Sequence, residues 1–278
     1  MEKPETLKLF EQSPYFSKKH KKYFQVYDEL FTSYKDKEIT FVEIGIANGG
    51  SLHMWKNFFG KKARIIGIDL NPECKKFEKF GFEIFIGNQS KKNFWKNFFS
   101  QVGKVDIILD DGGHTNQQQI LTAVNCIPNM NDRGLLLVED VHSSYIDHYG
   151  NPSKYSFINF CKKTINDVNS TFPGLKNYNF SLKKYVYSIE FLESFVAFKI
   201  DRRRCELNEP IDNGKISFFH SDYKYKNTKI DNLKNRLRFL MKSKIIKFLI
   251  TIFLSKFRYL YRITSNKLDI KNYIKYFK

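Results

Sequence analysis

The chain has 278 residues, enough for one large domain or for one domain with an appendage. Its four cysteines are widely spaced and form no CxxC pair, which excludes a disulfide framework and a zinc knuckle and fits a reducing compartment. The N-terminal residues lack the apolar segment of a signal peptide, and no stretch reaches the roughly 20 apolar residues of a membrane span. We therefore expect a cytoplasmic protein.

The net charge of +18 is concentrated towards the C-terminal end. From residue 221 onward, 16 Lys and Arg residues face only three Asp residues. The preceding residues are nearly balanced in charge, so the basic character belongs to an appendage. This distribution argues against a nucleic-acid-binding protein, and we expect no specific nucleic acid partner.

Residues 1–38 are expected to be mostly helical, and the basic segment 17–22 is expected to be a solvated face. Aromatic and aliphatic residues in this part are candidate packing positions: Tyr15, Phe16, Tyr23, Phe24, Tyr27, Leu30 and Phe31. The following residues alternate apolar, β-rich runs with helix-sized segments. The runs predict strands at 39–46, 63–70, 82–86, 105–109 and 134–138, and helices at 52–59, 91–101 and 115–126, with a short helix from Pro72. Such alternation predicts an α/β fold with a doubly wound, mostly parallel sheet.

A turn is expected at 131–134, before the fifth strand. Further along, residues 155–168 predict a long helix, and residues 185–191 and 194–200 predict an antiparallel hairpin that brings the sheet to seven strands. Residues 201–229 are polar and irregular, and residues 231–261 predict a basic helix. The expected organisation is an N-terminal helical segment (1–38), a central domain (39–200), and a polar linker with a basic helical tail (201–278).

A glycine-rich turn, Glu43-x-Gly45-x-Ala47-x-Gly49, follows the first strand and opens a helix. Small residues let the backbone approach a ligand, and the helix N-terminus supplies free N–H groups. Asp69 ends the next strand, where a carboxylate can accept hydrogen bonds from two ribose hydroxyls. The combination indicates a nucleoside-bearing cofactor, and Ala47 in the second glycine position favours S-adenosylmethionine over a dinucleotide. The alternative is that the glycines only make a tight turn.

Carboxylates also end the fourth and fifth predicted strands. Asp111 follows one strand, and Glu139 and Asp140 follow the other. Ends of neighbouring parallel strands meet at the mouth of a sheet, where α/β folds bind ligands. Carboxylate oxygens suit Mg²⁺, Mn²⁺ or Ca²⁺, so the pattern predicts a site for a hard divalent cation.

Two histidines accompany these acids. His114 follows Asp111 across two glycines that allow a sharp turn, and it is the candidate base for a hydroxyl activated by the metal. His142 is a second candidate, which orients a ligand or binds substrate. Asp110 is expected to support the site locally.

Several motifs together resemble the metal-dependent sugar O-methyltransferases of the macrocin and mycinamicin type and their relatives in surface-polysaccharide loci. The motifs are Val42-Glu43-Ile44-Gly45, Gly49-Gly50-Ser51-Leu52-His53-Met54-Trp55, Gly67-Ile68-Asp69-Leu70-Asn71-Pro72, Gly87-Asn88-Gln89-Ser90, Asp110-Asp111-Gly112-Gly113-His114, Glu139-Asp140-Val141-His142-Ser143-Ser144-Tyr145 and Tyr187-Ser188-Ile189-Glu190-Phe191-Leu192-Glu193-Ser194-Phe195-Val196. The resemblance covers about residues 40–200 and departs from the family at Asn88, where Asp is common.

The resemblance implies a class I methyltransferase fold, with Mg²⁺ held by Asp111, Glu139 and Asp140 and with His114 as general base. It places Asp69 on the cofactor ribose and Gln89-Ser90 near the adenine. The predicted cofactor site comprises Glu43, Gly45, Gly49, Ser51, Asp69, Gln89, Ser90 and Asp110.

The function expected from these features is S-adenosylmethionine-dependent and Mg²⁺-dependent (or Mn²⁺-dependent) O-methylation of a sugar hydroxyl, in surface polysaccharide or glycoconjugate biosynthesis. One alternative is a catechol-type or hydroxylase-like enzyme on the same fold. An iron-dependent hydroxylase would need two histidines and one carboxylate, which His114, His142 and a neighbouring acid can supply. A non-catalytic nucleic-acid-binding protein is less favoured, because the acidic site would repel phosphate.

The basic tail alternates apolar blocks with lysines between residues 239 and 254. Such a helix can lie on an anionic membrane surface. It can equally pack on the domain or on a second subunit, so the sequence leaves peripheral membrane contact and homo-oligomerisation as open alternatives.

Overall fold

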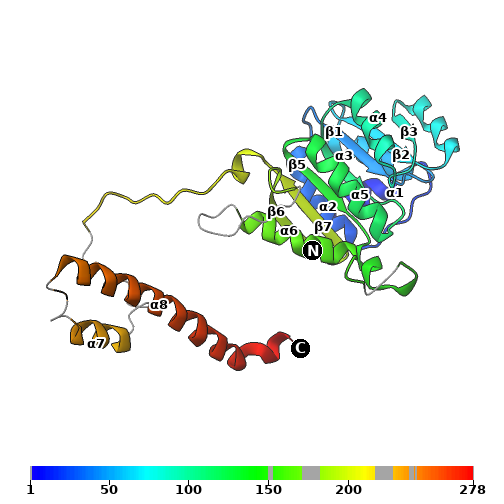
Figure 1. Cartoon of the computed structure of the whole chain (residues 1–278). Helices are drawn as coiled ribbons and strands as arrows, with labels where there is room; N and C mark the ends of the chain where they lie inside the picture. The colour runs from blue at the N-terminus through cyan, green and yellow to red at the C-terminus, as the bar shows by residue number, and fades with distance from the viewer. Residues whose placement is uncertain are drawn as a thin grey trace. The chain divides into compact units, whose positions relative to one another are not determined.

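The computed structural model describes residues 2–149, 153–170, 182–216, 228–237, 241 and 243–277. The chain divides into two compact units, residues 1–210 and residues 211–278 (Figure 1). Most of the predicted polar linker belongs to neither regular helix nor strand, and its residues 217–227 lie outside the described part. The first unit contains the sheet and all of the motifs considered above.

Seven strands form one sheet in the order β3-β2-β1-β4-β5-β7-β6. The strands are β1 (Thr40–Ile44), β2 (Arg64–Asp69), β3 (Glu83–Ile86), β4 (Val105–Asp110), β5 (Met130–Val138), β6 (Val186–Leu192) and β7 (Phe195–Ile200). Pairing is parallel from β3 to β5, and β7 is antiparallel to both β5 and β6. The predicted mostly parallel, seven-stranded sheet is confirmed.

Helices cover both faces of the sheet (Figure 1). One layer contains α1 (Glu5–Glu11), α2 (Tyr23–Phe31) and α3 (Gly50–Phe59), and the other contains α4 (Lys92–Val102), α5 (Asn116–Cys126) and α6 (Phe157–Asn169). Short 3₁₀ helices connect these elements: η1 (Thr32–Tyr34), η2 (Pro72–Phe80), η3 (Ile127–Asn129), η4 (Val141–Tyr145), η5 (Asp147–Tyr149) and η6 (Arg203–Cys205). The predicted short helix from Pro72 is therefore a 3₁₀ helix.

The central strands are apolar at nearly every position because both of their faces are buried. In β1, Phe41 packs in the layer of α2 and α3, and its neighbour Val42 packs in the layer of α4 to α6. In β5, Leu137 packs in the layer of α2 and α3, and Val138 packs in the layer of α4 to α6. The two cores lie on opposite faces, which leaves the ends of the strands as the place for polar side chains.

The turns that enter the helices are specified locally. Gly49 adopts a left-handed conformation (φ 72°) at the N-terminus of α3. Thr115 caps α5, accepting from the N–H of Gln118 while the Gln118 side chain accepts from the Thr115 N–H. This reciprocal capping box fixes the backbone directly after His114.

Two local expectations are wrong. Residues 131–134 do not form a separate turn but belong to β5. The β4–β5 register shifts between Val105 and Ile107, and Arg133 has a φ of 64°, so the strand absorbs the turn-forming residues as an irregularity. Phe16, a predicted packing position, is 70% exposed.

The second unit has two helices where one was predicted at 231–261. They are α7 (Thr228–Arg236) and α8 (Lys244–Tyr273), and the 3₁₀ helix η9 (Ile274–Phe277) follows α8. Residues 238–240 and 242 lie between them, outside the described part. No helix in the described ranges combines the length and the apolar composition that crossing a membrane requires.

Leu137 provides a test of the central core, because its side chain is fully buried in the middle of β5. We expect Leu137→Ala to lower the free energy of unfolding by about 2–5 kcal/mol, through lost burial and the cavity that remains. Urea denaturation measures the change. Leu207→Ala, at an exposed position, should change it by less than about 0.5 kcal/mol. Similar losses in both variants would contradict the assigned core.

Candidate active site

A cavity of about 280 Å³ opens at the carboxyl ends of β1, β2 and β4. Its wall includes residues from each of the predicted cofactor motifs. They are Ile44, Gly45, Ala47, Ile68, Asp69, Leu70, Gly87, Gln89, Asp111, Gly112, Gly113 and Gln118. Parallel strand ends are where α/β sheets bind ligands, so the cavity lies at the expected place.

Gly45 lies where the loop after β1 meets the backbone of the loop after β4. Its φ is 86°, and its N–H donates to the carbonyl of Ile68 at 2.8 Å. A Cβ at this position would lie 2.2 Å from the carbonyl oxygen of Asp111. Only glycine allows the loop after β1 to approach the loop after β4 so closely.

Asp69 faces the cavity from the end of β2. Its carboxylate accepts from the N–H of Ala47 and from the N–H of Asn71, both at 2.9 Å. Each oxygen accepts one of these bonds and retains a second lone pair for a ligand hydroxyl. The carboxylate therefore also ties the glycine-rich turn to β2.

Gln89 and Asp110 form a buried polar pair behind the cavity. Gln89 donates to Asp110 at 2.9 Å and accepts from the N–H of Gly113 at 3.0 Å. Asp110 also accepts from the N–H of Gly112 at 3.2 Å, and burial raises its pKa. The pair shapes the glycine loop that precedes His114.

Of the predicted cofactor set, Gly45, Asp69 and Gln89 therefore line the cavity. The other members lie beside or behind it. Glu43 is fully buried and accepts from the hydroxyl of Ser51 at 2.7 Å, Gly49 begins α3, and Ser90 precedes α4. Leu70 belongs to one of the motifs but was not predicted as a cofactor residue. It lines the cavity, is 60% exposed and offers an apolar surface to a flat ring.

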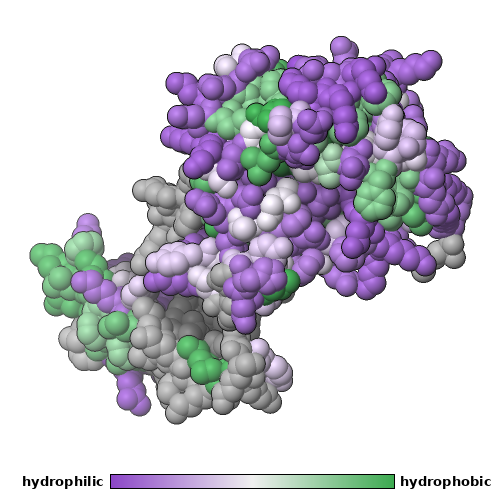
Figure 2. Space-filling model, turned by 90° about the vertical axis from the view of Figure 1, so that its right-hand side faces the viewer, coloured by the Kyte–Doolittle hydropathy of each residue, from purple (hydrophilic) through white to green (hydrophobic). Residues whose placement is uncertain are grey.

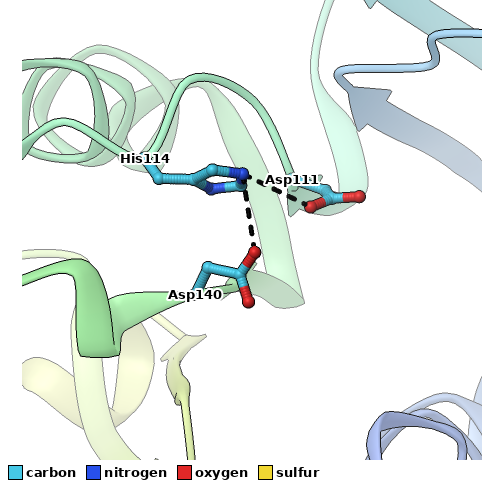
Figure 3. Close-up of side chains that lie close together, drawn as sticks. All are labelled: Asp111, His114 and Asp140. Carbon is cyan, nitrogen blue, oxygen red and sulfur yellow. Dashed lines mark ion pairs between the residues drawn. The ribbon is translucent and has the colours of Figure 1, made fainter. Parts of the chain in front are cut away.

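Three side chains converge at the ends of β4 and β5 in a group that is able to hold a metal ion: Asp111, His114 and Asp140. Their donor atoms lie within 4.8 Å of one another. The imidazole of His114 points towards both carboxylates, with Nε2 3.9 Å from Asp111 Oδ1 and 3.5 Å from Asp140 Oδ2 (Figure 3). His114 (φ 57°) and Asp140 (φ 53°) both adopt left-handed backbone conformations, which are unfavourable outside glycine and aim the two side chains at each other.

The donor chemistry of this group fits a hard divalent cation. Two carboxylates provide oxygen ligands, and the three side chains are partly exposed, so an ion and a substrate hydroxyl can reach them. His142 lies outside the group, with Nδ1 3.1 Å from the hydroxyl of Ser194 and 3.9 Å from Asp140 Oδ1. Among the described residues, the group has a single histidine, whereas an iron site of the hydroxylase type needs two.

Glu139, the third predicted metal ligand, lies deeper than Asp140. It is fully buried, and the hydroxyl of Tyr27 donates to it. Burial and the neighbouring charge of Asp111 raise the pKa of Glu139. Tyr23 likewise donates to Asp140, and burial and this bond raise the pKa of the Tyr23 hydroxyl. Two tyrosines of α2 thus reach the acidic strand ends.

The expectation of a solvated basic face at 17–22 is wrong for Lys19. Its side chain is only 3% exposed, and Nζ lies 2.5 Å from Asp111 Oδ2, 3.2 Å from Glu139 Oε2 and 3.8 Å from Glu43 Oε1. Burial alone would lower the pKa of Lys19, but the three carboxylates outweigh it and raise the pKa. Burial also raises the pKa of Glu43, to about 7.

The fold of this chain resembles that of a solved methyltransferase. MycE methyltransferase from the mycinamycin pathway, solved with Mg, S-adenosylhomocysteine and mycinamycin VI, superposes with a TM-score of 0.65, covering 80% of this chain and 58% of MycE at 22% identity. The chain has a class I methyltransferase fold. No protein-family model matches the sequence.

Curated relatives carry the resemblance at the sequence level. The chain is 30% identical over 130 residues to 8-demethyl-8-alpha-L-rhamnosyl tetracenomycin-C 2'-O-methyltransferase of Streptomyces olivaceus, which covers 44% of this chain and 34% of that protein. It is 30% identical over 134 residues to demethylmacrocin O-methyltransferase of Streptomyces fradiae, covering 46% and 33%. The predicted resemblance to sugar O-methyltransferases is confirmed, and the chain spans about a third of the length of these relatives.

Gly45 and Gly103 form a matched pair for testing the close approach of the two loops. Both have a positive φ, 86° and 79°, but an added Cβ at Gly103 meets nothing within 4 Å. We expect Gly103→Ala to lower the free energy of unfolding by about 1–3 kcal/mol through backbone strain alone, because its φ and ψ of 79° and −156° are adopted almost only by glycine. Gly45→Ala should cost clearly more and should also abolish binding of S-adenosylmethionine, as measured by denaturation and calorimetry. Equal effects of the two substitutions would show that the approach to Asp111 is not tight.

Proposed function

We propose that the chain is an S-adenosylmethionine-dependent and Mg²⁺-dependent O-methyltransferase that acts on a sugar hydroxyl. The observation that carries this proposal is the position of Asp111. Its side chain lines the cavity at the ends of β1, β2 and β4, and it also belongs to the group with His114 and Asp140. One residue therefore joins a nucleoside-sized cavity to a cation site, which methyl transfer to a metal-held hydroxyl requires.

The cavity supplies what the methyl donor needs. S-adenosylmethionine, when bound, provides the methyl group. Asp69 would accept from the ribose hydroxyls, Leu70 would cover the adenine, and Gly45 leaves room for the donor between the two loops. Gln89 lines the wall and holds the loop of Gly112 and Gly113, so its contribution is to the shape of the cavity as much as to direct contact.

Asp111 and Asp140 would hold the metal ion, with Glu139 behind them. Mg²⁺ or Mn²⁺, when bound, lowers the pKa of a coordinated hydroxyl and orients it. His114 would take the proton from that hydroxyl, because its Nε2 faces the same two carboxylates. A carboxylate 3.5 Å away stabilises the imidazolium that results.

The names of the relatives support a sugar as the acceptor. They describe enzymes that methylate rhamnosyl, olivosyl and macrolide sugars. We place the reaction in surface polysaccharide or glycoconjugate biosynthesis, in the cytoplasm. His142 stands at the rim with its side chain 47% exposed, and it would contact the acceptor there.

His114→Ala tests the base. We expect turnover to fall by about 10²–10⁴-fold, the usual contribution of a positioned acid or base, while the affinity for S-adenosylmethionine is unchanged. Mass spectrometry measures methyl gain on a panel of sugar acceptors, and calorimetry measures donor binding. His148→Ala, which alters an exposed histidine on η5, is the matched control and should keep full activity.

Removal of the metal tests the cation site. Chelation should abolish turnover in the wild type, with recovery on adding Mg²⁺ or Mn²⁺. Full activity of His114→Ala, or activity in excess chelator, would overturn the mechanism.

We also propose that α8 contacts an anionic membrane surface. Its residues Ile245, Phe248, Leu249, Ile252 and Phe253 are exposed and recur at helical spacing, so they form one apolar face. Figure 2 shows hydrophobic side chains on the surface of the C-terminal unit. Among the described residues, none of these five lines the cavity that Lys234 of α7 shares with α8.

The packed side of α8 carries different residues. Thr251, Leu254 and Ser255 line a cavity of about 320 Å³ together with Lys234 of α7, and Leu254 is buried. Lys244 borders the apolar face and Lys256 continues it one turn further along the helix, whereas Lys247 lies on the side of Leu254. Apolar side chains flanked by lysines match the chemistry of anionic lipid headgroups over acyl chains, and such a position would bring the enzyme to lipid-linked glycans.

Two double variants with the same change in charge test this contact in the full chain. Leu249→Glu with Phe253→Glu alters the apolar face, and Thr251→Glu with Ser255→Glu alters the packed side. We expect the first pair to weaken co-sedimentation with phosphatidylglycerol-containing vesicles by at least about 100-fold, since burying a Leu or Phe side chain is worth about 1.5–3 kcal/mol. The second pair should lose far less, and neutral vesicles should bind the wild type weakly. Equal sedimentation of the two double variants would contradict the membrane face.

A further inference from the structure

We infer that Lys19 is a resident cation of the acidic site, which occupies its inner half and confines a divalent ion to the outer half. The inner half consists of Glu43, Glu139 and the Oδ2 side of Asp111, and all three face Lys19 Nζ. The outer half consists of the Oδ1 side of Asp111 with His114 and Asp140. The inference concerns the binding of the metal and rests on the metal site within the proposed function.

The two oxygens of Asp111 divide the site. Oδ2 accepts from Lys19 at 2.5 Å, and Oδ1 faces His114 at 3.9 Å. Because the carboxylate of Asp111 contacts Lys19 with one oxygen and faces the cation site with the other, any rotation towards one of them weakens its contact with the other. Lys19 thus sets the orientation of the residue that links the cavity to the cation site.

Glu139 is the residue most affected. Lys19 Nζ lies 3.2 Å and 3.4 Å from its two oxygens, and the hydroxyl of Tyr27 donates to one of them. Because both oxygens of Glu139 already contact these donors, they are poorly available as ligands for an ion beside Asp140. Without Lys19, it would face Asp111 across the place that the ammonium group fills.

Lys19 is held in position by the segment between α1 and α2. The hydroxyl of Ser13 donates to the carbonyl of Gly50 at 2.7 Å, which ties the start of this segment to α3. At its other end, Tyr23 donates to Asp140, and Lys22 pairs with Glu193 at 2.7 Å. The segment therefore crosses the mouth of the acidic site and delivers one buried ammonium group into it.

The charge balance shows why a second cation is still needed. Glu43, Asp111 and Glu139 surround one lysine, and Asp140 lies beyond them beside His114, whereas the exposed Lys22 faces a single glutamate. Buried carboxylates are retained only with compensating charge and hydrogen bonds. One ammonium group compensates the inner half, and the outer half remains for a divalent ion.

The test is a Mg²⁺ titration by calorimetry on the full chain, without methyl donor or acceptor, comparing the wild type with Lys19→Met. We expect Lys19→Met to bind Mg²⁺ about 10- to 100-fold more tightly, because the substitution removes a positive charge that repels the ion over a few ångströms. Removal of the lysine releases Glu139 as an additional ligand and frees Oδ2 of Asp111. Lys22→Met, in the same segment but exposed, should leave the affinity unchanged.

Glu139→Gln and the double variant Lys19→Met with Glu139→Gln complete the design. The gain in affinity should largely disappear in the double variant, because the released ligand is absent. Thermal unfolding gives a second readout: Mg²⁺ should raise the Tm of Lys19→Met more than that of the wild type. If Lys19→Met folds only with Mg²⁺ present, the ion has replaced the lysine, which also supports the inference.

Unchanged or weaker Mg²⁺ binding by Lys19→Met would overturn the role of Lys19 and leave the proposed methyl transfer intact. If Lys19→Met does not fold even with Mg²⁺, Lys19→Gln takes its place, because it removes the charge but keeps a hydrogen-bond donor beside the carboxylates, and it should bind Mg²⁺ more tightly than the wild type. Equal affinities there would overturn the inference. An absence of Mg²⁺ binding in every variant would overturn both the inference and the proposed metal.

Discussion

The structure depends on one electrostatic constraint, the gathering of four carboxylates at the carboxyl ends of β1, β4 and β5. Parallel pairing of β1 with β4 and of β4 with β5 brings Glu43, Asp111 and Glu139 to the same edge of the sheet. Buried carboxylates in a low-dielectric surrounding are costly without compensation. Much of what surrounds the site is compensation, supplied by groups from outside the sheet.

The N-terminal segment provides these groups. Tyr27 and Tyr23 of α2 donate to Glu139 and Asp140, and Lys19 carries the only ammonium group among the described residues that contacts Asp111. The segment packs through α1 and α2 into one core with the sheet. A part of the chain that lies before the first strand therefore belongs to the chemistry of the site, although it carries none of the motifs.

The sequence was informative where a pattern has one physical meaning. Apolar runs of five or six residues have to be buried on both faces, so the strands and their mostly parallel pairing were predictable. The ends of these strands determine where Asp69, Asp111 and Asp140 lie. The glycine at position 45 was predictable as a close approach, because glycine-rich turns between strand and helix rarely serve another purpose. The turn predicted at residues 131–134 was wrong, because the irregularity in β5 contains the same residue types that form turns.

Lys19 lay beyond sequence reasoning for a physical reason. Lysines in a run such as Ser17-Lys18-Lys19-His20-Lys21-Lys22 are usually solvated, and which one turns inward depends on carboxylates more than 20 residues away in sequence. The role of Leu70 was also not predictable from the sequence, because an exposed leucine indicates a binding surface only once the cavity beside it is known. Motifs locate the residues that touch a ligand through backbone geometry, whereas long side chains such as Lys and Tyr are placed by the charges they meet. The division of the acidic site between a lysine and a divalent ion follows from that placement.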